Sequence, residues 1–365
     1  MTISREERER RYGAIRELMN QGGLGSLVIA GRGDRLSRGN IRYVTGYGPI
    51  VGPQYCVFPS EGSPIFVARN TPFLATLRER DWDLEYKLTT DQNAEVQALV
   101  AELDTGRRVG IVGLSDIPVP LYLALRERFE ERLVDATWIF RQLRTIKSAE
   151  EIEMMRVSAL VADEVFDRLK ELARPGVSDF EIYGEVKRII HQRGCEYSME
   201  LINSEGTKLN LFYPTGNRLE ANGTLSLEIT PAYEGYFTQL PVTVPVGEYP
   251  SQIRDMIAVW QEALERATSI LRPGTVVSDV HRAMIEPIHE AGYVAPWRCG
   301  HAIGLDVIDF WGVDGSNATA LEAGMTLALH PGPLVESLAE GFAMGYTYLV
   351  TDGGYEKLNG ADLPV

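Results

Sequence analysis

The sequence predicts an α/β protein with two domains, and three observations lead to this prediction. First, 365 residues are enough for two domains of roughly 100–200 residues each. Second, short apolar runs such as GSLVIAGRG and RRVGIVGL alternate with helical patterns over residues 1–145, as in α/β domains. Third, two similar segments, 172–194 and 271–292, lie in the rest of the chain. We therefore predict one α/β domain over 1–145 and a second over 146–365.

A long helix marks the start of the second domain. Ser148 and Glu151 form an S-x-x-E pattern, which is typical of a capping box at the first turn of a helix. Apolar residues then recur mostly every three or four positions, as on one face of an amphipathic helix. These residues are Ile152, Met155, Leu160, Val161, Val165, Leu169 and Leu172.

The two similar segments predict a pair of related halves in the second domain. Each contains an Arg-Pro-Gly turn, a Ser-Asp pair, an amphipathic helical pattern with a histidine, and a final glycine. We expect Ser178 and Ser278 to be helix N-caps, and Gly194 and Gly292 to end the helices. Strand-like sequence follows both helices, at 224–246 after the first and at 325–330 and 346–351 after the second. The repeat predicts internal pseudo-twofold symmetry, with two sheets around a common cleft.

Side-chain alternation in the first strand-like run selects candidate site residues. Leu225, Leu227 and Ile229 share one face of this run, which places Glu228 on the opposite face. Polar residues on the face toward the cleft become candidates for a functional site.

Charge and composition exclude several classes of partner. The chain has 36 Lys and Arg against 51 Asp and Glu, a net charge of −15, which opposes binding to nucleic acid or to an anionic membrane. The charged opening MTISREERERRYGAIRELMN has no apolar core, and no later stretch reaches roughly 18 apolar residues. We expect a cytoplasmic protein. Cys56, Cys195 and Cys299 form no CxxC pair and are expected to be free thiols.

Histidines are the first candidates for chemistry, because no GxSxG, P-loop, dinucleotide-binding or HExxH motif is present. We expect His191, His281 and His289 to be solvated on helices. His301 lies in a glycine-rich segment, CGHAIGL, and His330 ends a strand pattern before Pro-Gly-Pro. For both, a buried structural imidazole remains an equal alternative.

Several motifs resemble those of the creatinase/aminopeptidase P/prolidase family, which has the pita-bread fold. NIRYVTGY resembles a signature of that family's N-terminal domain, and RTIKSAEEIEMMRVSALVAD resembles the first helix of its catalytic domain. GHAIGLDV resembles its Gly-His-Gly-Ile-Gly motif, EAGMTLALHPG its Pro-Gly-Met strand, and YLVTDGGYEKL its closing Val-Thr segment. The resemblance implies a creatinase-type, ribonuclease H-like α/β domain over 1–145 and a pita-bread domain over 146–365.

The resemblance also implies departures at the metal site. The family's metallopeptidases hold two divalent ions with Asp, Asp, His, Glu and Glu. Matched motif by motif, these positions hold Glu228, Gln239, His301, His330 and Gly345. One carboxylate of four remains, whereas a dinuclear centre needs carboxylates to balance four positive charges. We therefore expect no dinuclear metallopeptidase and no resident cofactor.

Other working residues of the family are altered as well. The proton-shuttling histidine that follows the glycine motif falls on Ile308, with Asp309 beside it, and the catalytic histidine of creatinase falls near Phe212. The family implies a homodimer in which an N-terminal loop closes the partner's site. The matching loop is 46–54, where Pro53 stands and no arginine is present, which argues against creatine as substrate.

Three functions remain open from the sequence. In the first, Glu228, His301 and His330 perform metal-independent acid and base catalysis on a small organic molecule, as in C–N bond hydrolysis of the creatinase type or, alternatively, in C–C or C–S bond cleavage by a lyase. In the second, the same three residues hold one divalent ion, zinc, iron or manganese. In the third, the pocket only binds a ligand.

Substrate contacts are predicted around the same motifs. Aromatic residues gather there, and Arg298 has the chemistry to pair with a substrate carboxylate, although ordinary packing and a surface position are alternatives. The predicted substrate-binding residues are Gln239, Phe212, Tyr213, Arg298, Asp309 and Trp311.

Overall fold

The protein is described from a computed structural model, for residues 2–48, 52–69, 82–104, 106–208, 211–336 and 340–363. The chain divides into two compact units, Met1–Arg144 and Thr145–Val365. The domain boundary predicted between 145 and 146 lies one residue from this division. The loop 46–54, predicted to close a partner's site, includes 49–51, which lie outside the described residues.

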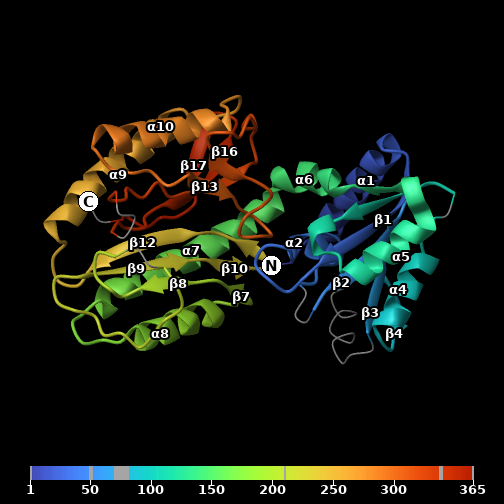
Figure 1. Ribbon diagram of the computed structural model, residues 1–365, viewed down its shortest axis with the longest axis horizontal. Coiled ribbons are helices and arrows are strands. Elements are labelled where there is room, and N and C mark those ends of the chain that lie inside the picture. The colour runs from blue at the N-terminus through green and yellow to red at the C-terminus, as the bar shows by residue number, and fades with distance from the viewer. Residues whose placement is uncertain are drawn as a thin grey trace. The chain divides into compact units, whose positions relative to one another are not determined.

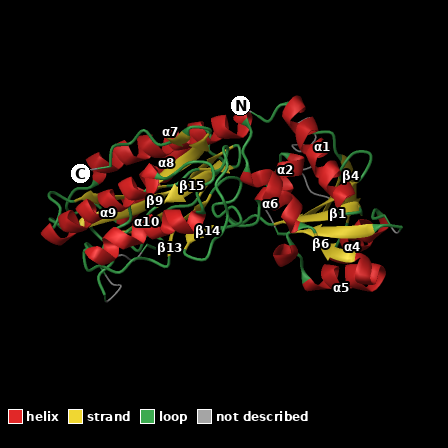
Figure 2. Ribbon diagram, turned by 90° about the horizontal axis from the view of Figure 1, so that it is seen from above, coloured by secondary structure: helices red, strands yellow, loops and turns green. Residues whose placement is uncertain are grey.

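The N-terminal unit is built on one mixed sheet. Within the described residues its strand order is β4-β3-β2-β1-β5-β6. The central strand β1 is buried along its whole length, pairs antiparallel with β2 and parallel with β5. Figure 2 shows α1 and α5 on opposite sides of this sheet. The strands are β1 (Leu24–Gly31), β2 (Gln54–Pro59), β3 (Ile65–Arg69), β4 (Glu85–Thr89), β5 (Arg108–Val112) and β6 (Leu133–Asp135); the helices are α1 (Arg5–Gln21), α2 (Gly39–Thr45), α4 (Gln92–Ala101), α5 (Val119–Phe129) and α6 (Thr137–Thr145).

The C-terminal unit has two halves, each with a pair of helices against a sheet (Figure 1). In the first half, α7 (Ala149–Leu172) and α8 (Asp179–Gln192) accompany the sheets β12-β9-β8 and β11-β10-β7. In the second half, α9 (Ser251–Ser269) and α10 (Val277–Glu290) accompany the sheet β14-β13-β15-β16-β17. The strands are β7 (Tyr197–Ser198), β8 (Leu201–Asn203), β9 (Thr224–Ile229), β10 (Pro231–Tyr233), β11 (Tyr236–Phe237), β12 (Leu240–Pro245), β13 (Arg298–Ala302), β14 (Gly312–Asp314), β15 (Thr326–Leu329), β16 (Tyr346–Thr351) and β17 (Gly354–Lys357).

The helix starts of the two halves differ in one respect from the prediction. Ser178 caps α8 as expected, because its Oγ accepts from Glu181 N and its own N donates to the Glu181 carboxylate. In contrast, α10 begins at Val277, so the prediction of Ser278 as N-cap is wrong. The amide of Val277 donates instead to Thr319 O, and the amide of Ser278 donates to Asn317 O, so the first turn of α10 needs no side-chain cap.

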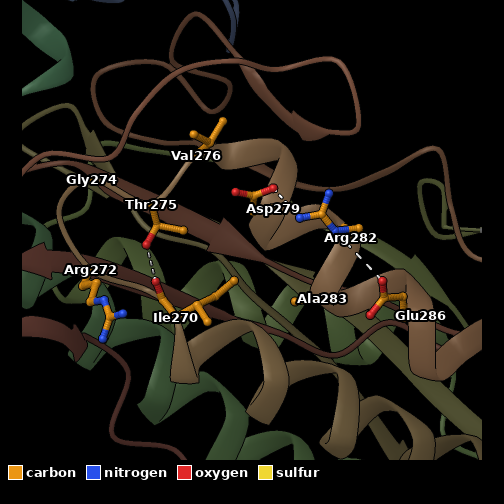
Figure 3. A pocket seen from close by; sticks show the side chains of 9 residues that line it. All are labelled: Ile270, Arg272, Gly274, Thr275, Val276, Asp279, Arg282, Ala283 and Glu286. Atoms are coloured by element: carbon orange, nitrogen blue, oxygen red, sulfur yellow. Dashed lines mark hydrogen bonds and ion pairs between the residues drawn. The ribbon is translucent and has the colours of Figure 1, made fainter.

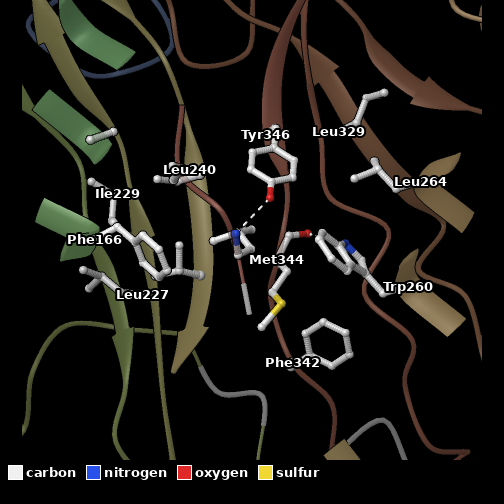
Figure 4. Packing of buried hydrophobic residues seen from close by; sticks show 14 of the residues in the cluster. Phe166, Leu227, Ile229, Leu240, Trp260, Leu264, Leu329, Phe342, Met344 and Tyr346 are labelled. Atoms are coloured by element: carbon white, nitrogen blue, oxygen red, sulfur yellow. Dashed lines mark hydrogen bonds between the residues drawn. The ribbon is translucent and has the colours of Figure 1, made fainter. Parts of the chain in front are cut away.

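The core of the C-terminal unit lies between the sheets and the helices (Figure 4). Leu225, Leu227 and Ile229 are fully buried and pack with Phe166 of α7 in this core. The predicted alternation along β9 is confirmed, since Glu228 is partly exposed between Leu227 and Ile229. On the other side of the core, Trp260 of α9 donates from Nε1 to Met344 O at 3.0 Å.

Candidate active site

Two histidines from neighbouring strands form the centre of the candidate site. His301 lies on β13, and His330 follows β15, which pairs antiparallel with β13. The amide of His330 donates to Cys299 O at 2.9 Å, which extends this pairing to the histidine. The two imidazole rings meet edge to face, with centroids 5.4 Å apart. The sheet thus brings together two residues that are 29 positions apart in the sequence.

Both imidazoles are uncharged at neutral pH. Burial, followed by the charges of His330 and Arg298, lowers the pKa of His301 to about 3. Burial and Arg298 also lower the pKa of His330 to about 4. Nδ1 of His301 lies 3.1 Å from the carbonyl oxygen of Ala302, whereas Nε2 of His330 is buried without a hydrogen-bond partner in the described part of the chain. Both pKa values lie below the ordinary histidine value of about 6.5.

Glu228 and Gln239 come from the facing half of the unit. Glu228 lies on β9 opposite Pro241 of β12 and Leu201 of β8. Gln239, which precedes β12, is 2% exposed, and its backbone N and O both bond to Thr347 Oγ1 at 2.9 Å. Its side-chain Oε1 is buried and has no hydrogen-bond partner among the described residues. Gln239 is therefore fixed in place by its backbone, and its side-chain oxygen is available to accept a hydrogen bond.

Arg298 is the group that links the two halves electrostatically. Its guanidinium interacts with the charge of Glu228 and with both imidazoles, His301 and His330. Burial lowers the pKa of Arg298, while Glu228 and Asp314 oppose this effect. The predicted residues Glu228, Arg298, His301 and His330 thus form one electrostatically connected group.

Gly345 allows a close approach of two strands beside His330. A Cβ atom at position 345 would lie 2.2 Å from Leu329 O, 2.7 Å from His330 Cβ and 2.8 Å from His330 Cα. Such distances are well inside van der Waals contact, and two of these atoms are backbone. Position 345 therefore accepts only glycine with the strands where they are, and His330 occupies the adjoining space.

Asp309, a predicted substrate contact, forms a buried ion pair. Its Oδ2 lies 3.1 Å from Lys147 Nζ, and the two side chains are 1% and 2% exposed. A Cβ at Gly304 would meet both side chains, at 2.5 Å from Asp309 Oδ2 and 2.9 Å from Lys147 Cε. This buried ion pair joins the 304–309 segment to the residues just before α7. Sequence reasoning missed Lys147, because no local pattern links positions 162 residues apart.

The aromatic candidates are divided between surface and interior. Phe212 and Tyr213 are 61% and 54% exposed, and their rings contact each other at 5.5 Å. Trp311 is partly buried against the core, and its Nε1 has no partner among the described residues. The structure therefore places Trp311 beside the sheet that holds His301, and places the other two rings at the surface.

One further histidine differs from the prediction. His281 is buried, because it follows Val277 by four residues and shares the inner face of α10 with Val280 and Met284. His191 and His289 are exposed, as expected.

A surface hollow elsewhere in the unit is lined by charged side chains that pair with one another. It has a volume of about 370 Å³ and lies at the start of α10 (Figure 3). Arg282 pairs there with Asp279 at 2.5 Å and approaches Glu286 at 4.0 Å. Its lining residues are Ile270, Arg272, Gly274, Thr275, Val276, Asp279, Arg282, Ala283 and Glu286. This hollow contains none of the candidate catalytic residues.

The donor set at the candidate site does not fit a pair of divalent ions. One carboxylate, one amide and two imidazoles stand at the matched positions, together with a glycine. His301 also directs its ring toward the backbone carbonyls of Ala302 and Val307. Among the described residues, no group of three or more His, Cys, Asp or Glu side chains is arranged to hold a metal ion.

Comparison with known proteins identifies the family. Residues 153–352 match the model of metallopeptidase family M24, and residues 11–146 match the creatinase/prolidase N-terminal domain. The chain belongs to metallopeptidase family M24. The predicted family and fold class are confirmed, and the prediction of a hydrolase is confirmed at the level of the family.

Individual relatives are similar over different shares of the chain. An uncharacterised peptidase of Staphylococcus aureus is 30% identical over 229 residues, which are 61% of this chain and 65% of that protein. An uncharacterised hydrolase/peptidase of Sinorhizobium fredii is 28% identical over 97% of this chain and 95% of its own length.

Solved structures share the fold at low identity. The Xaa-Pro dipeptidase of Bacillus anthracis has a TM-score of 0.83 at 20% identity and covers 98% of this chain and 99% of its own. The X-Pro aminopeptidase of Thermotoga maritima has a TM-score of 0.86 at 17% identity, with 97% and 98% covered. Within the described residues, no helix combines the length and apolar character required to cross a membrane.

Proposed function

We propose that the protein is a metal-independent hydrolase that cleaves a C–N bond in a small organic molecule. The observation that supports this proposal is the grouping of Glu228, Arg298 and two uncharged imidazoles. This group contains an anionic base, a fixed cation and two hydrogen-bonding rings, which are the elements of acid and base catalysis without an ion.

Glu228 is the proposed general base, because it is the carboxylate of the group. It accepts a proton from a water molecule as the water oxygen forms a bond to the carbon of the scissile C–N group. The same proton then passes from Glu228 to the leaving nitrogen as the C–N bond breaks. This step regenerates the Glu228 carboxylate, and the water oxygen remains bonded to the carbon. Neutral His330 donates a hydrogen bond to the oxygen or nitrogen on which charge develops.

His301 is proposed to position the second ring rather than to transfer a proton itself. Its Nδ1 faces the Ala302 carbonyl, and its ring edge packs against His330. These contacts fix the orientation of both rings, as hydrogen bonds commonly do for catalytic imidazoles.

Two alternative functions are distinguished from this proposal by experiment. The named relatives are peptidases, so cleavage of Xaa-Pro dipeptides with an added metal is the first alternative. A single zinc, iron or manganese ion at Glu228, His301 and His330, serving a lyase, is the second.

The experiment combines elemental analysis with an activity screen. Purified protein is assayed, with and without a chelator, on small amides, lactams, ureido compounds and Xaa-Pro dipeptides. We expect substoichiometric metal, activity on small C–N compounds that survives chelation, and loss of activity in Glu228→Gln. Glu220→Gln, an exposed carboxylate shortly before β9, is the matched control and keeps its activity. Stoichiometric metal that disappears in Glu228→Gln, or activity that requires added ions, would contradict the proposal.

The family resemblance also leads us to propose a homodimer acting on a small-molecule substrate. Light scattering of the purified protein tests the first part, and a monomer at assay concentration would contradict it.

A further inference from the structure

We infer that Arg298 is the anion-binding group of the candidate site, and that the substrate carries a carboxylate. This inference rests on the proposed function for its link to catalysis, but its own evidence is the position of Arg298 in the sheet. It assigns to Arg298 a role in binding that the family match and the chemistry of Glu228 leave open.

A β-bulge places Arg298 on the same face of the sheet as His301. Residues three apart on a regular strand point to opposite faces. Here Arg298 pairs with Asp314, and His301 pairs with Gly312, so three steps along β13 correspond to two steps along β14. The extra residue in β13 restores the phase, and both side chains project from one face. Interaction of the Arg298 charge with both imidazoles agrees with this arrangement.

Gly312 provides the space that the Arg298 side chain occupies. A Cβ at position 312 would lie 2.7 Å from Arg298 Cδ and 3.3 Å from Arg298 Cγ. The stem of the arginine therefore lies across the glycine, and any larger residue displaces it. Above the stem, the guanidinium lies over the ring of Trp297 at 5.3 Å from the ring centroid. The side chain is thus held on two sides before any ligand binds.

The guanidinium has unused hydrogen-bonding capacity. Within the described residues, Arg298 makes no hydrogen bond and no ion pair within 4 Å, although it is half-buried. Asp314, the carboxylate paired with it across the strands, uses its Oδ1 elsewhere, since this oxygen accepts from Ser316 N at 2.8 Å and from Ser316 Oγ at 2.6 Å. A half-buried guanidinium with free N–H groups is the usual receptor for a carboxylate, which it binds through two parallel hydrogen bonds.

The charge and the shape of the Arg298 guanidinium favour a carboxylate as its ligand. Arg298 is the cation that interacts with both His301 and His330, so an anion bound among these side chains would pair with it. A planar carboxylate matches the fork of the guanidinium and lies flat against the Trp297 side, whereas one arginine is a poor match for a doubly charged phosphate.

The test compares carboxylates with their neutral counterparts. Acetate, benzoate and N-acetylglycine are titrated into the full-length protein beside acetamide, benzamide and N-acetylglycinamide. Binding is followed by calorimetry and by the ring signals of isotope-labelled histidine, which five histidines make assignable with single variants. We expect at least one carboxylate to shift the signals of His301 and His330, and its amide to bind about 10- to 100-fold more weakly, the range for a charge-assisted pair.

Variants locate the binding group. Arg298→Gln should weaken the carboxylate to the level of the amide, Arg298→Lys should retain part of the affinity, and Gly312→Ala should weaken it without a change of charge. Arg282→Gln, an exposed arginine in the hollow at α10, is the control for net charge and should bind as the wild type does. Equal binding of acid and amide, binding of no carboxylate, or wild-type binding by Arg298→Gln would overturn the inference.

The same measurements separate this inference from the proposed function. Carboxylate binding that depends on Arg298 in a protein without hydrolase activity would support the inference and contradict the function. Hydrolysis of neutral compounds that survives Arg298→Gln would support the function and overturn the inference.

Discussion

The buried ion pair between Lys147 and Asp309 predicts a large loss of stability when one partner is removed. The two side chains are 2% and 1% exposed, and the pair closes a loop of 162 residues. Replacement of one member leaves the other charge buried, which costs about 3–5 kcal/mol in comparable pairs. For a domain the size of Thr145–Val365, each kcal/mol lowers the melting temperature by about 2–4 °C. Lys147→Met should therefore lower it by roughly 6–20 °C.

Urea unfolding of Lys147→Met, Asp309→Leu and the double variant measures this effect. We expect both single variants to be strongly destabilised and the double variant to recover most of the loss, because no charge remains buried. The exposed pair of Arg266 and Glu262, at 2.6 Å, is the matched control, and Glu262→Gln should cost less than about 1 kcal/mol. A cost below about 1 kcal/mol in both single variants, or an additive double variant, would refute the reasoning.

Three other predictions concern the two site histidines, Gly345, and the contact of Asp179 with residues 215 and 216. The pKa values of His301 and His330 are lowered to about 3 and about 4 in the folded protein. At pH values below the histidine pKa of the unfolded chain, the unfolded chain therefore binds more protons than the folded protein does. The contribution of these two rings to the unfolding free energy should be fully present above about pH 6.5 and fall toward pH 4 by at most about 2.7 kcal/mol per pH unit. Urea titrations at several pH values measure this loss, and a flat profile would contradict the burial of these rings. Gly345→Ala should cost about 1–3 kcal/mol or more through overpacking against Leu329 and His330, and unchanged stability would show that the strands separate freely. Asp179 accepts from Thr215 N at 3.0 Å and Gly216 N at 2.8 Å, so Asp179→Ala should cost about 2 kcal/mol and speed hydrogen exchange at these two amides; unaltered exchange would be evidence against this anchor.

Most of the fold was predictable because local patterns in the sequence agree with the tertiary structure. The capping box at Ser148, the N-cap at Ser178 and the alternation of Leu225, Leu227 and Ile229 are local signals, and each appears in the structure as expected. The exception is Ser278, where carbonyl groups from a distant segment satisfy the first turn of α10. Helix boundaries are the part of a helix that tertiary contacts alter most easily.

The sequence could select candidate residues for the site, but it could not indicate their physical state. Motif spacing indicated Glu228, His301 and His330, because side chains alternate regularly between the two faces of a strand. It did not indicate that burial lowers both histidine pKa values, that Lys147 neutralises Asp309, or that a bulge turns Arg298 toward the histidines. Each of these properties depends on residues far apart in the sequence or on one inserted residue in a strand, which composition and periodicity do not reveal.

The close approach at Gly345 has a consequence for the evolution of this chain. A carboxylate fits at that position only if the backbone near Leu329 and His330 first moves apart, because even the Cβ of alanine collides with it. A path of single substitutions toward a second acidic ligand therefore passes through a destabilised intermediate. The order of changes therefore matters, since the strands have to separate before an acidic side chain is introduced.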